Sequence, residues 1–434
     1  MMKILVCGAN GFIGRHLCLH LQAAGHRVLR GIRPGVPATC PAPDDVWMDF
    51  SSDTQTTIWE SRLQQAGQID VIINAIGILH ESGKQTFEAI HRDAPIAMYQ
   101  AAQRLGITRI VQISALGGNQ DVQIHEGMSP YLRTKRETDL FLLQSDLSAL
   151  ILCPSLIVGL DGISSRFFRV LASLPVLLIP GDGQQRLQPV HIDDLCEAVV
   201  RWLSHPADKT VTLDVVGPCA MTYTEMLGNY RQLMGLQPGH VLRIPLWIMH
   251  TAAGLSRFFP QRLLSHDSLR MLENHNVADP APLQQLLARP SRNKESWFPQ
   301  IPASMLASEA LLKWHLMCYR STLALIWIVT AVLSLGLYPI QDSLQLLQAL
   351  PVPASLQLPL LYSAGVLDGL LGLACIVFPS RKLWVFQLGL IGVYSLLIAL
   401  YLPQFWLHPF GPILKNVAIV ALLISLISTD RKAS

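Results

Sequence analysis

Residues 3–14, KILVCGANGFIG, decide the fold of the N-terminal half of the chain. A short apolar run ends at Gly8, and Gly8, Gly11 and Gly14 then follow in the spacing G-x-x-G-x-x-G. These glycines allow a tight turn, a close approach of the backbone to a pyrophosphate and close packing of helix on strand. The stretch predicts a strand–turn–helix unit that binds a dinucleotide through Gly8, Asn10, Gly11, Phe12, Ile13 and Gly14.

Strand-like and helix-like stretches continue to alternate downstream. The strand candidates are HRVLRGIR (26–33), DVIINAIG (70–77), ITRIVQISALGG (107–118) and LSALILCPSLIVG (147–159), separated by helical stretches such as DAPIAMYQAAQRLG (93–106). This pattern predicts an α/β fold, a Rossmann-type doubly wound parallel sheet whose ligand lies at the carboxyl ends of the strands. Ala75, Gly77 and Pro154 lie where two of the expected strands end, within or at the end of these runs, and are expected to border the cofactor.

The end of the second strand bears on the choice of cofactor. An Asp or Glu normally binds the ribose hydroxyls of NAD there, but this chain has Arg30 and Arg33, with Arg15 beside the last glycine. Arginines at this place can bind a 2′-phosphate, so NADP(H) is favoured and NAD(H) is the alternative. Either strand-end arginine could instead be a solvated charge. Asp49 could bond the adenine edge or simply stabilise a turn.

Composition excludes several classes of protein. The chain has 434 residues, 50% hydrophobic and only 15% charged, with a net charge of +3 and no run of basic residues with interleaved aromatics, so we do not expect a nucleic-acid partner. Its eight cysteines lack metal-like spacing, and neither a zinc site nor a disulfide framework is expected. The apolar run ILVC is too short for a secretory signal, so the first domain is expected in the cytoplasm.

Apolar residues are concentrated near the end of the chain. Four stretches, 321–341, 358–378, 383–405 and 412–428, carry almost no charge and predict an all-α bundle of four transmembrane helices. The alternative is a soluble domain of very hydrophobic helices. The positive-inside rule places the N-terminal domain and the C-terminus in the cytoplasm, at a bacterial-type inner membrane. The basic residues that set this orientation are Lys313, Arg320, Arg381, Lys382, Arg431 and Lys432, against Asp342 and His408 in the other loops.

Two charged residues fall inside these stretches. Asp368 lies at the centre of the second and Lys415 near the outer end of the fourth. A buried ion pair between them is one hypothesis; a neutral aspartate with Lys415 reaching outward is the other. Residues 301–320 indicate a juxtamembrane helix, either lying on the membrane or serving as a linker. The predicted domains are thus 1–217 (dinucleotide binding), 218–300 (substrate lobe and linker), 301–320 and 321–434.

Several motifs together carry a resemblance to a known family. GANGFIG, INAIG, YLRTK, LCPSLIVG and QPVHIDDLCEAV occur in the order found in extended and atypical short-chain dehydrogenases/reductases, part of the NAD(P)-dependent epimerase/dehydratase superfamily. Residues 2 to 300 most resemble the branch containing NADH-dehydrogenase accessory-subunit-like proteins, and MTYTEMLGNYRQLMGL resembles their substrate lobe. The tail, particularly HPFGPILKNVAIV, resembles the DoxX-like membrane family.

The resemblance implies a catalytic relay in SPYLRTKRE (129–137). Ser129 and Pro130 are a good helix start, and Tyr131 and Lys135 share one face. The lysine would lower the tyrosine pKa and hold the nicotinamide ribose, while the phenol exchanges a proton with substrate. Ser114 would complete the relay, although the family usually has its serine or threonine where this chain has Ala115 and Leu116.

Two more features of the sequence bear on the relay: a departure from the family pattern and a candidate general base. The helix asparagine common in the family is replaced by the segment AIHRDAP, with His91 and Asp93. His191, before Asp193 and Asp194, is either a general base or a hydrogen-bonded structural residue at a helix start.

The sequence therefore favours a membrane-tethered NAD(P)H-dependent oxidoreductase that acts on a hydrophobic carbonyl, alcohol or quinone-like substrate. One alternative is a non-catalytic NAD(P)-binding sensor or assembly factor at the membrane. A second is a sugar-nucleotide epimerase or dehydratase. The expected partners are the lipid bilayer and a hydrophobic small molecule; a membrane protein partner or a homo-oligomer is left open.

Overall fold

The computed structural model describes residues 1–34, 44–117, 128–205, 209–249, 251, 276–406 and 411–429. The chain divides into two compact units, Met1–Ala310 and Leu311–Ser434, and each is described by itself. Part of the predicted substrate lobe and linker (252–275), and the loop and tail residues His408, Arg431 and Lys432, lie outside the described residues.

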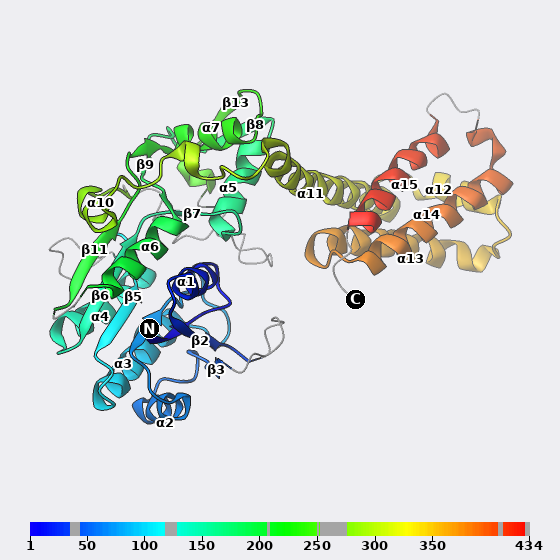
Figure 1. The fold of residues 1–434 in the computed structure, drawn as a ribbon. Coiled ribbons are helices and arrows are strands. Elements are labelled where there is room, and N and C mark those ends of the chain that lie inside the picture. Colours follow the sequence, from blue (N-terminus) through cyan, green and yellow to red (C-terminus); the bar gives the residue numbers. More distant parts are fainter. Residues whose placement is uncertain are drawn as a thin grey trace. The chain divides into compact units, whose positions relative to one another are not determined.

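The first unit is built on a parallel sheet of seven strands in the order β11-β6-β5-β4-β1-β2-β3 (Figure 1). All neighbouring strands in it run parallel. The order reverses between β1 and β4, which makes this the switch point where ligands of doubly wound sheets bind. The predicted Rossmann-type sheet is confirmed. Its strands are β1 (Lys3–Cys7), β2 (Arg27–Ile32), β3 (Asp45–Trp47), β4 (Val71–Asn74), β5 (Arg109–Ile113), β6 (Ser148–Pro154) and β11 (Val211–Val215).

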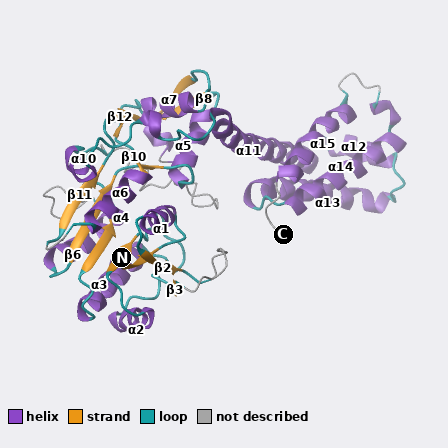
Figure 2. Ribbon diagram, in the orientation of Figure 1, coloured by secondary structure: helices purple, strands orange, loops and turns teal. Residues whose placement is uncertain are grey.

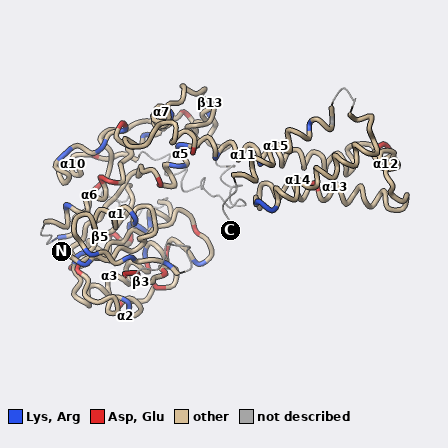
Figure 3. Tube along the Cα trace, turned by 45° about the vertical axis from the view of Figure 1, so that its right-hand side comes forward, with Lys and Arg blue, Asp and Glu red and all other residues tan. Residues whose placement is uncertain are grey.

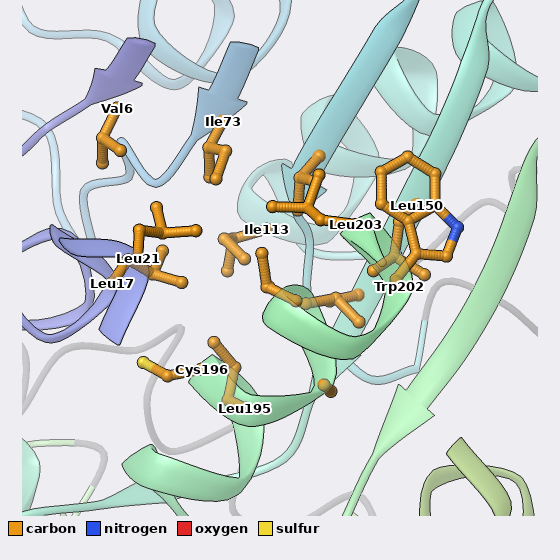
Figure 4. Close-up of a cluster of buried hydrophobic side chains, with 14 of the residues drawn as sticks. Val6, Leu17, Leu21, Ile73, Ile113, Leu150, Leu195, Cys196, Trp202 and Leu203 are labelled. Carbon is orange, nitrogen blue, oxygen red and sulfur yellow. The ribbon is translucent and has the colours of Figure 1, made fainter. Parts of the chain in front are cut away.

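Helices cover both faces of this sheet because its strands are apolar on both sides. On one face lie α1 (Phe12–Ala23), α6 (Ile192–Leu203) and α10 (Ala281–Leu287). Figure 4 shows this core, in which Val6, Ile73, Ile113 and Leu150 of the strands meet Leu17, Leu21, Leu195 and Trp202 of the helices. On the other face lie α2 (Thr56–Ala66), α3 (Ala94–Arg104) and α4 (Pro130–Gln144).

A small lobe is interleaved with the last strands of the sheet, since part of it lies between β6 and β11 in the chain and part follows β11. It comprises α5 (Ile163–Ser173), α7 (Tyr223–Leu233) and paired short strands, with the turn around the 3-10 segment Lys294–Ser296. The strand pairs are β8 (Val176–Pro180) with β13 (His240–Ile244), and β9 (Arg186–Leu187) with β12 (Met221–Thr222); β7 (Ile157–Val158) pairs with β10 (Val190–His191) at its edge. A capping box of Thr222 and Glu225 starts α7.

The second unit contains only helices among its described residues (Figure 2). They are the later part of α11 (Ala303–Val332), a π-helical turn Leu333–Leu337, α12 (Ile340–Gln348), α13 (Ala354–Val377), α14 (Arg381–Tyr401), a 3-10 turn Pro403–Phe405 and α15 (Pro412–Thr429). The predicted juxtamembrane segment and first span form one continuous helix, α11. Helix α12 lies where a loop was expected.

Three of these helices are long and apolar enough to cross a membrane: Ala303–Leu337, Ala354–Val377 and Arg381–Tyr401. Figure 3 shows few charged residues along them. The apolar helix Ile413–Thr429, where the fourth span was predicted, is shorter. In the described part of the chain, the four predicted spans thus correspond to three helices long enough to cross a membrane and one shorter helix.

The interior of this unit contains polar side chains. The Trp327 indole donates to Gln387 at 3.1 Å, and the Gln387 amide donates to the Cys375 sulfur at 3.2 Å. Asp368 is buried, whereas Lys415 is exposed. One carboxylate oxygen of Asp368 has no hydrogen-bond partner among the described residues. The hypothesised Asp368–Lys415 ion pair is therefore wrong, because the buried carboxylate and the exposed lysine do not meet.

Candidate active site

The glycine turn lies at the switch point of the sheet. Gly8 adopts φ +82°, and a Cβ there would lie 2.9 Å from Ile76 Cγ1. A Cβ on Gly14 would lie 2.1 Å from the Gly8 carbonyl oxygen. Only glycine fits either position, since helix α1 rests directly on the turn. No side chain within the described chain caps α1, so its N-terminal N–H groups can receive a phosphate.

Phe12 connects this turn with a second loop. A Cβ on Gly159 would lie 2.6 Å from the Phe12 ring, and one on Gly162 would lie 3.1 Å from it. In the same loop, Asp161 accepts from Arg15 at 2.6 Å and contacts His16 at 3.0 Å. Arg15 is therefore held by a carboxylate at the side of the predicted pyrophosphate site.

The two strand-end arginines differ in their surroundings. Arg30 forms a bidentate ion pair with Asp45 of β3, at 2.7 and 2.9 Å. Hydrogen bonding to Asp45 raises the pKa of Arg30, and the pair occupies the guanidinium. Arg33 is exposed and has no ion-pair partner among the residues described. Asp49 accepts from the Ser51 N–H and hydroxyl, so it does stabilise a turn.

Lys135 lies beneath the carboxyl ends of two strands. Its ammonium is buried and donates to the carbonyl oxygens of Ile113 at 2.9 Å and Ile76 at 3.3 Å. A Cβ on Gly77 would lie 3.4 Å from its Nζ, so the absence of a side chain at Gly77 keeps the lysine's approach open. Burial lowers the pKa of Lys135 to about 8, and the charge of Asp139 acts in the opposite direction.

Ser114 is hydrogen-bonded to Asp139, a residue that the sequence motifs did not indicate. Its hydroxyl donates to the carboxylate of Asp139, which is buried in α4. Asp139 stands four positions after Lys135, and this i,i+4 spacing on one helix face was the available signal. Burial raises the pKa of Asp139, while the Ser114 bond and the Lys135 charge oppose the shift. Ala115 and Leu116, the two residues after Ser114, are buried.

Tyr131 projects from the first turn of α4, which begins at Ser129 and Pro130 as predicted. Its ring stands edge-on to His91, with centroids 5.2 Å apart, and to Phe87 at 5.9 Å. Burial raises the pKa of Tyr131 to about 12. The expected lowering by Lys135 is wrong, because that ammonium is directed at backbone carbonyls and the aromatic surroundings disfavour a phenolate.

The sequence motifs also left His91 without a role. It lies in the π-helical segment Glu88–Asp93 that precedes α3. Its Nε2 accepts from the Ile78 N–H at 3.0 Å, so the proton sits on Nδ1, which faces the Thr134 hydroxyl at 3.4 Å. Burial and the charge of Lys135 lower the pKa of His91 to about 2. His91 is therefore a neutral residue that fixes the loop after β4 against α4.

His191 has a structural position. It caps α6 by accepting from the Asp193 N–H at 3.2 Å, and its Nε2–H donates to the Trp297 carbonyl at 3.2 Å. Burial lowers its pKa. Of the two interpretations of His191, a general base or a hydrogen-bonded structural residue, the second fits this geometry.

The predicted site residues are distributed over one edge of the sheet. Gly8, Ala75, Gly77 and Ser114 follow the ends of β1, β4 and β5 there, and Pro154 ends β6. Gly14 and Lys135 join them from α1 and α4. Among the described residues, no group of three or more His, Cys, Asp or Glu side chains could hold a metal ion.

This arrangement defines a dinucleotide-binding domain of the short-chain dehydrogenase/reductase type. The NAD dependent epimerase/dehydratase family matches residues 4–215, and the DoxX-like family matches residues 324–424. The chain therefore combines an epimerase/dehydratase-family domain with a C-terminal DoxX-like domain. Both predicted resemblances are confirmed.

Relatives of known name match the first domain. Ceramide reductase of Caulobacter vibrioides is 26% identical over 248 residues, covering 56% of this chain and 73% of that protein. The mitochondrial NADH dehydrogenase [ubiquinone] 1 alpha subcomplex subunit 9 of Mus musculus is 28% identical over 225 residues, covering 49% of this chain. The chain spans little more than half, 56%, of that subunit's length.

A solved structure supports the same fold. MoeE5 in complex with UDP-glucuronic acid and NAD superposes with a TM-score of 0.51 at 20% identity, covering 70% of this chain and 99% of MoeE5. The match to the NAD dependent epimerase/dehydratase family indicates a nicotinamide cofactor for this chain. The DoxX-like match and the three apolar helices indicate a membrane protein.

Proposed function

We propose that this chain is a membrane-tethered NAD(P)H-dependent oxidoreductase acting on a hydrophobic carbonyl, alcohol or quinone-like substrate, with residues 218–300 contributing the substrate lobe. The observation that carries the proposal is the buried Lys135, whose ammonium donates to carbonyl oxygens after β4 and β5, with Tyr131 four positions before it on the same helix. A bound nicotinamide would supply or accept the hydride.

The protein's own residues would handle the proton. With a pKa of about 12, Tyr131 stays protonated at neutral pH and can donate its phenolic proton to a carbonyl oxygen that gains negative charge. This favours carbonyl reduction over alcohol oxidation near neutrality. Lys135 would donate to the cofactor ribose from its place below the strand ends. Ser114 would act through Asp139, which balances the charge of Lys135.

The choice between the two cofactors rests on Arg33. Because Asp45 already occupies Arg30, the exposed Arg33 is the better candidate to bind a 2′-phosphate. NADP(H) is accordingly the proposed cofactor, with NAD(H) as the alternative.

The second unit supports a lipid-soluble substrate. Tethering a catalytic domain to a bilayer is most useful when the substrate is dissolved in that bilayer. One relative is named a ceramide reductase, which is consistent with a lipid as substrate. The proposed location is a bacterial-type inner membrane with the first domain on the cytoplasmic side, because Lys313, Arg320, Arg381 and Lys382 flank the apolar helices.

Three observations favour other functions. The Ser114 hydroxyl is already bonded to Asp139, and some relatives are NADH dehydrogenase subunits. Both observations favour a non-catalytic sensor or assembly factor. The fold neighbour that binds a UDP-sugar acid and NAD leaves a sugar-nucleotide epimerase or dehydratase as the second alternative.

The test is NADPH oxidation by the detergent-purified protein supplied with total membrane lipid and quinone extract. Tyr131→Phe should abolish oxidation while NADPH binding, followed by its fluorescence, is retained. Tyr223→Phe, a buried tyrosine of the small lobe, is the matched control and should remain active. Binding without oxidation in the native protein, together with full biological activity of Tyr131→Phe, would favour the non-catalytic alternative. Turnover of a soluble UDP-sugar instead would support the second alternative.

A further inference from the structure

The small lobe contains a buried cation among aromatic rings, which we call the Arg169 cluster: Arg169 and Phe168 of α5, Tyr230 of α7, and Trp297 and Phe298. Arg169, Tyr230 and Trp297 are 1%, 0% and 2% exposed. The Arg169 guanidinium lies 5.5 Å from the Phe298 ring centroid. The Tyr230 ring lies 5.4 Å from that of Trp297 and 6.4 Å from those of Phe168 and Phe298.

Three polar atoms of this cluster lack a hydrogen-bond partner among the described residues: Arg169 Nη1, Tyr230 Oη and Trp297 Nε1. The Ser165 hydroxyl accepts from the Gly159 N–H at 3.1 Å, and its effect on Tyr230 is to lower the phenol pKa that burial raises, which is the effect of a donor to the phenol oxygen and leaves the phenol's own O–H without an acceptor. Buried polar atoms are almost always paired, so three unpaired ones on neighbouring side chains need an explanation. Each of the three can donate a hydrogen bond, and two of them can only donate.

The guanidinium is also short of negative charge. Its Nη2 donates to the Leu160 carbonyl at 2.8 Å and to the Glu309 carboxylate at 3.2 Å. The same carboxylate lies 3.7 Å from Arg166, so two guanidinium groups share it. Burial lowers the pKa of Arg169, and Glu309 opposes this. A further anionic oxygen at Nη1 would compensate the desolvated charge.

The cluster also adjoins the cofactor side of the first unit. Leu160, whose carbonyl binds Arg169, belongs to the loop in which Gly159 and Gly162 pack against Phe12 of the glycine turn. One short loop thus contacts both places.

We propose that Arg169 Nη1, Tyr230 Oη and Trp297 Nε1 form a binding site for an anionic oxygen group, a phosphate or carboxylate, on a molecule whose adjoining part is apolar or aromatic. The donors select the oxyanion, and the Phe168 and Phe298 rings take the apolar part. The molecule could be a lipid with an acidic head group or a soluble metabolite. The site is independent of the proposed reaction, since binding is measured without turnover.

The test is isothermal titration of the full-length protein in a non-ionic detergent with hexyl phosphate, inorganic phosphate and hexanol. Hexyl phosphate should bind and hexanol should not. Tyr230→Phe and Trp297→Phe each remove one unpaired donor and keep an aromatic side chain, and each should weaken hexyl phosphate about tenfold. Inorganic phosphate binding as tightly as hexyl phosphate would support the site and identify a free anion as its ligand; tighter hexyl phosphate would identify an amphiphile.

Trp59→Phe is the matched control, because the Trp59 indole is buried but donates to the Asp53 carbonyl at 2.6 Å. It should lower the melting temperature and leave hexyl phosphate affinity unchanged. Tyr230→Phe should leave the melting temperature nearly unchanged, because it keeps the shape of the ring. Trp297→Phe should lower it, because the smaller ring leaves a cavity, so its hexyl phosphate affinity is compared with that of Trp59→Phe, which loses the same volume. The proposal is overturned if neither anion binds, or if both variants bind hexyl phosphate as the native protein does.

Discussion

Replacing Gly14 by alanine tests the packing that forms the cofactor turn. The new Cβ would lie 2.1 Å from the Gly8 carbonyl oxygen, 2.7 Å from the Gly8 carbonyl carbon and 2.9 Å from Ala9 Cα. All three are backbone atoms, so no side chain can rotate away. Helix α1 would have to retreat from the turn by about 1 Å, and such overpacking costs about 1–3 kcal/mol.

Gly228 of α7 is the matched control for this change. It is also a helical glycine, but a Cβ there meets no atom within 4 Å. Gly228→Ala should stabilise the protein by about 0.5–1 kcal/mol through helix propensity alone. Gly14→Ala makes the same gain, so setting it against the overpacking cost leaves a net destabilisation of up to about 2.5 kcal/mol.

The assay is thermal unfolding of the detergent-solubilised variants together with NADPH fluorescence titration. Gly14→Ala should lower the melting temperature and weaken NADPH at least about tenfold, because the N–H groups at the start of α1 move with the helix. Gly228→Ala should raise the melting temperature slightly and bind NADPH normally. A Gly14→Ala protein that matches the native one in both measurements would refute the close packing of α1 on the turn.

Two further predictions concern the cofactor site. Arg33→Ala should weaken NADPH binding about tenfold and leave NADH binding unchanged. Arg30→Ala should weaken NADPH binding less, because Asp45 holds that side chain. Equal losses of NADPH affinity in titrations of both variants would contradict the assignment of Arg33. NADPH affinity should fall as pH rises through about 8, where Lys135 loses its proton, and Asp139→Asn should move this fall to lower pH because it removes the charge that keeps the lysine protonated. An unchanged midpoint in the variant would show that Asp139 does not act on Lys135.

The sequence by itself determined the architecture. The glycine spacing after an apolar run, the alternating strands and helices, and the uncharged stretches near the end follow from local periodicity and composition, which do not depend on distant contacts. The start of α4 at Ser129 and Pro130 was predictable for the same reason: a cap is formed by residues adjacent in the chain.

Only the tertiary structure decided what the chemically important side chains contact. Asp45 occupies Arg30 across a strand pair, Ser114 bonds to Asp139, and Lys135 is directed at two strand-end carbonyls. Each partner is brought close by the register of the sheet or by packing of a helix on it. The pKa of Tyr131 followed from burial, a property of the packed state, which is why its direction was opposite to that expected from the i,i+4 spacing alone.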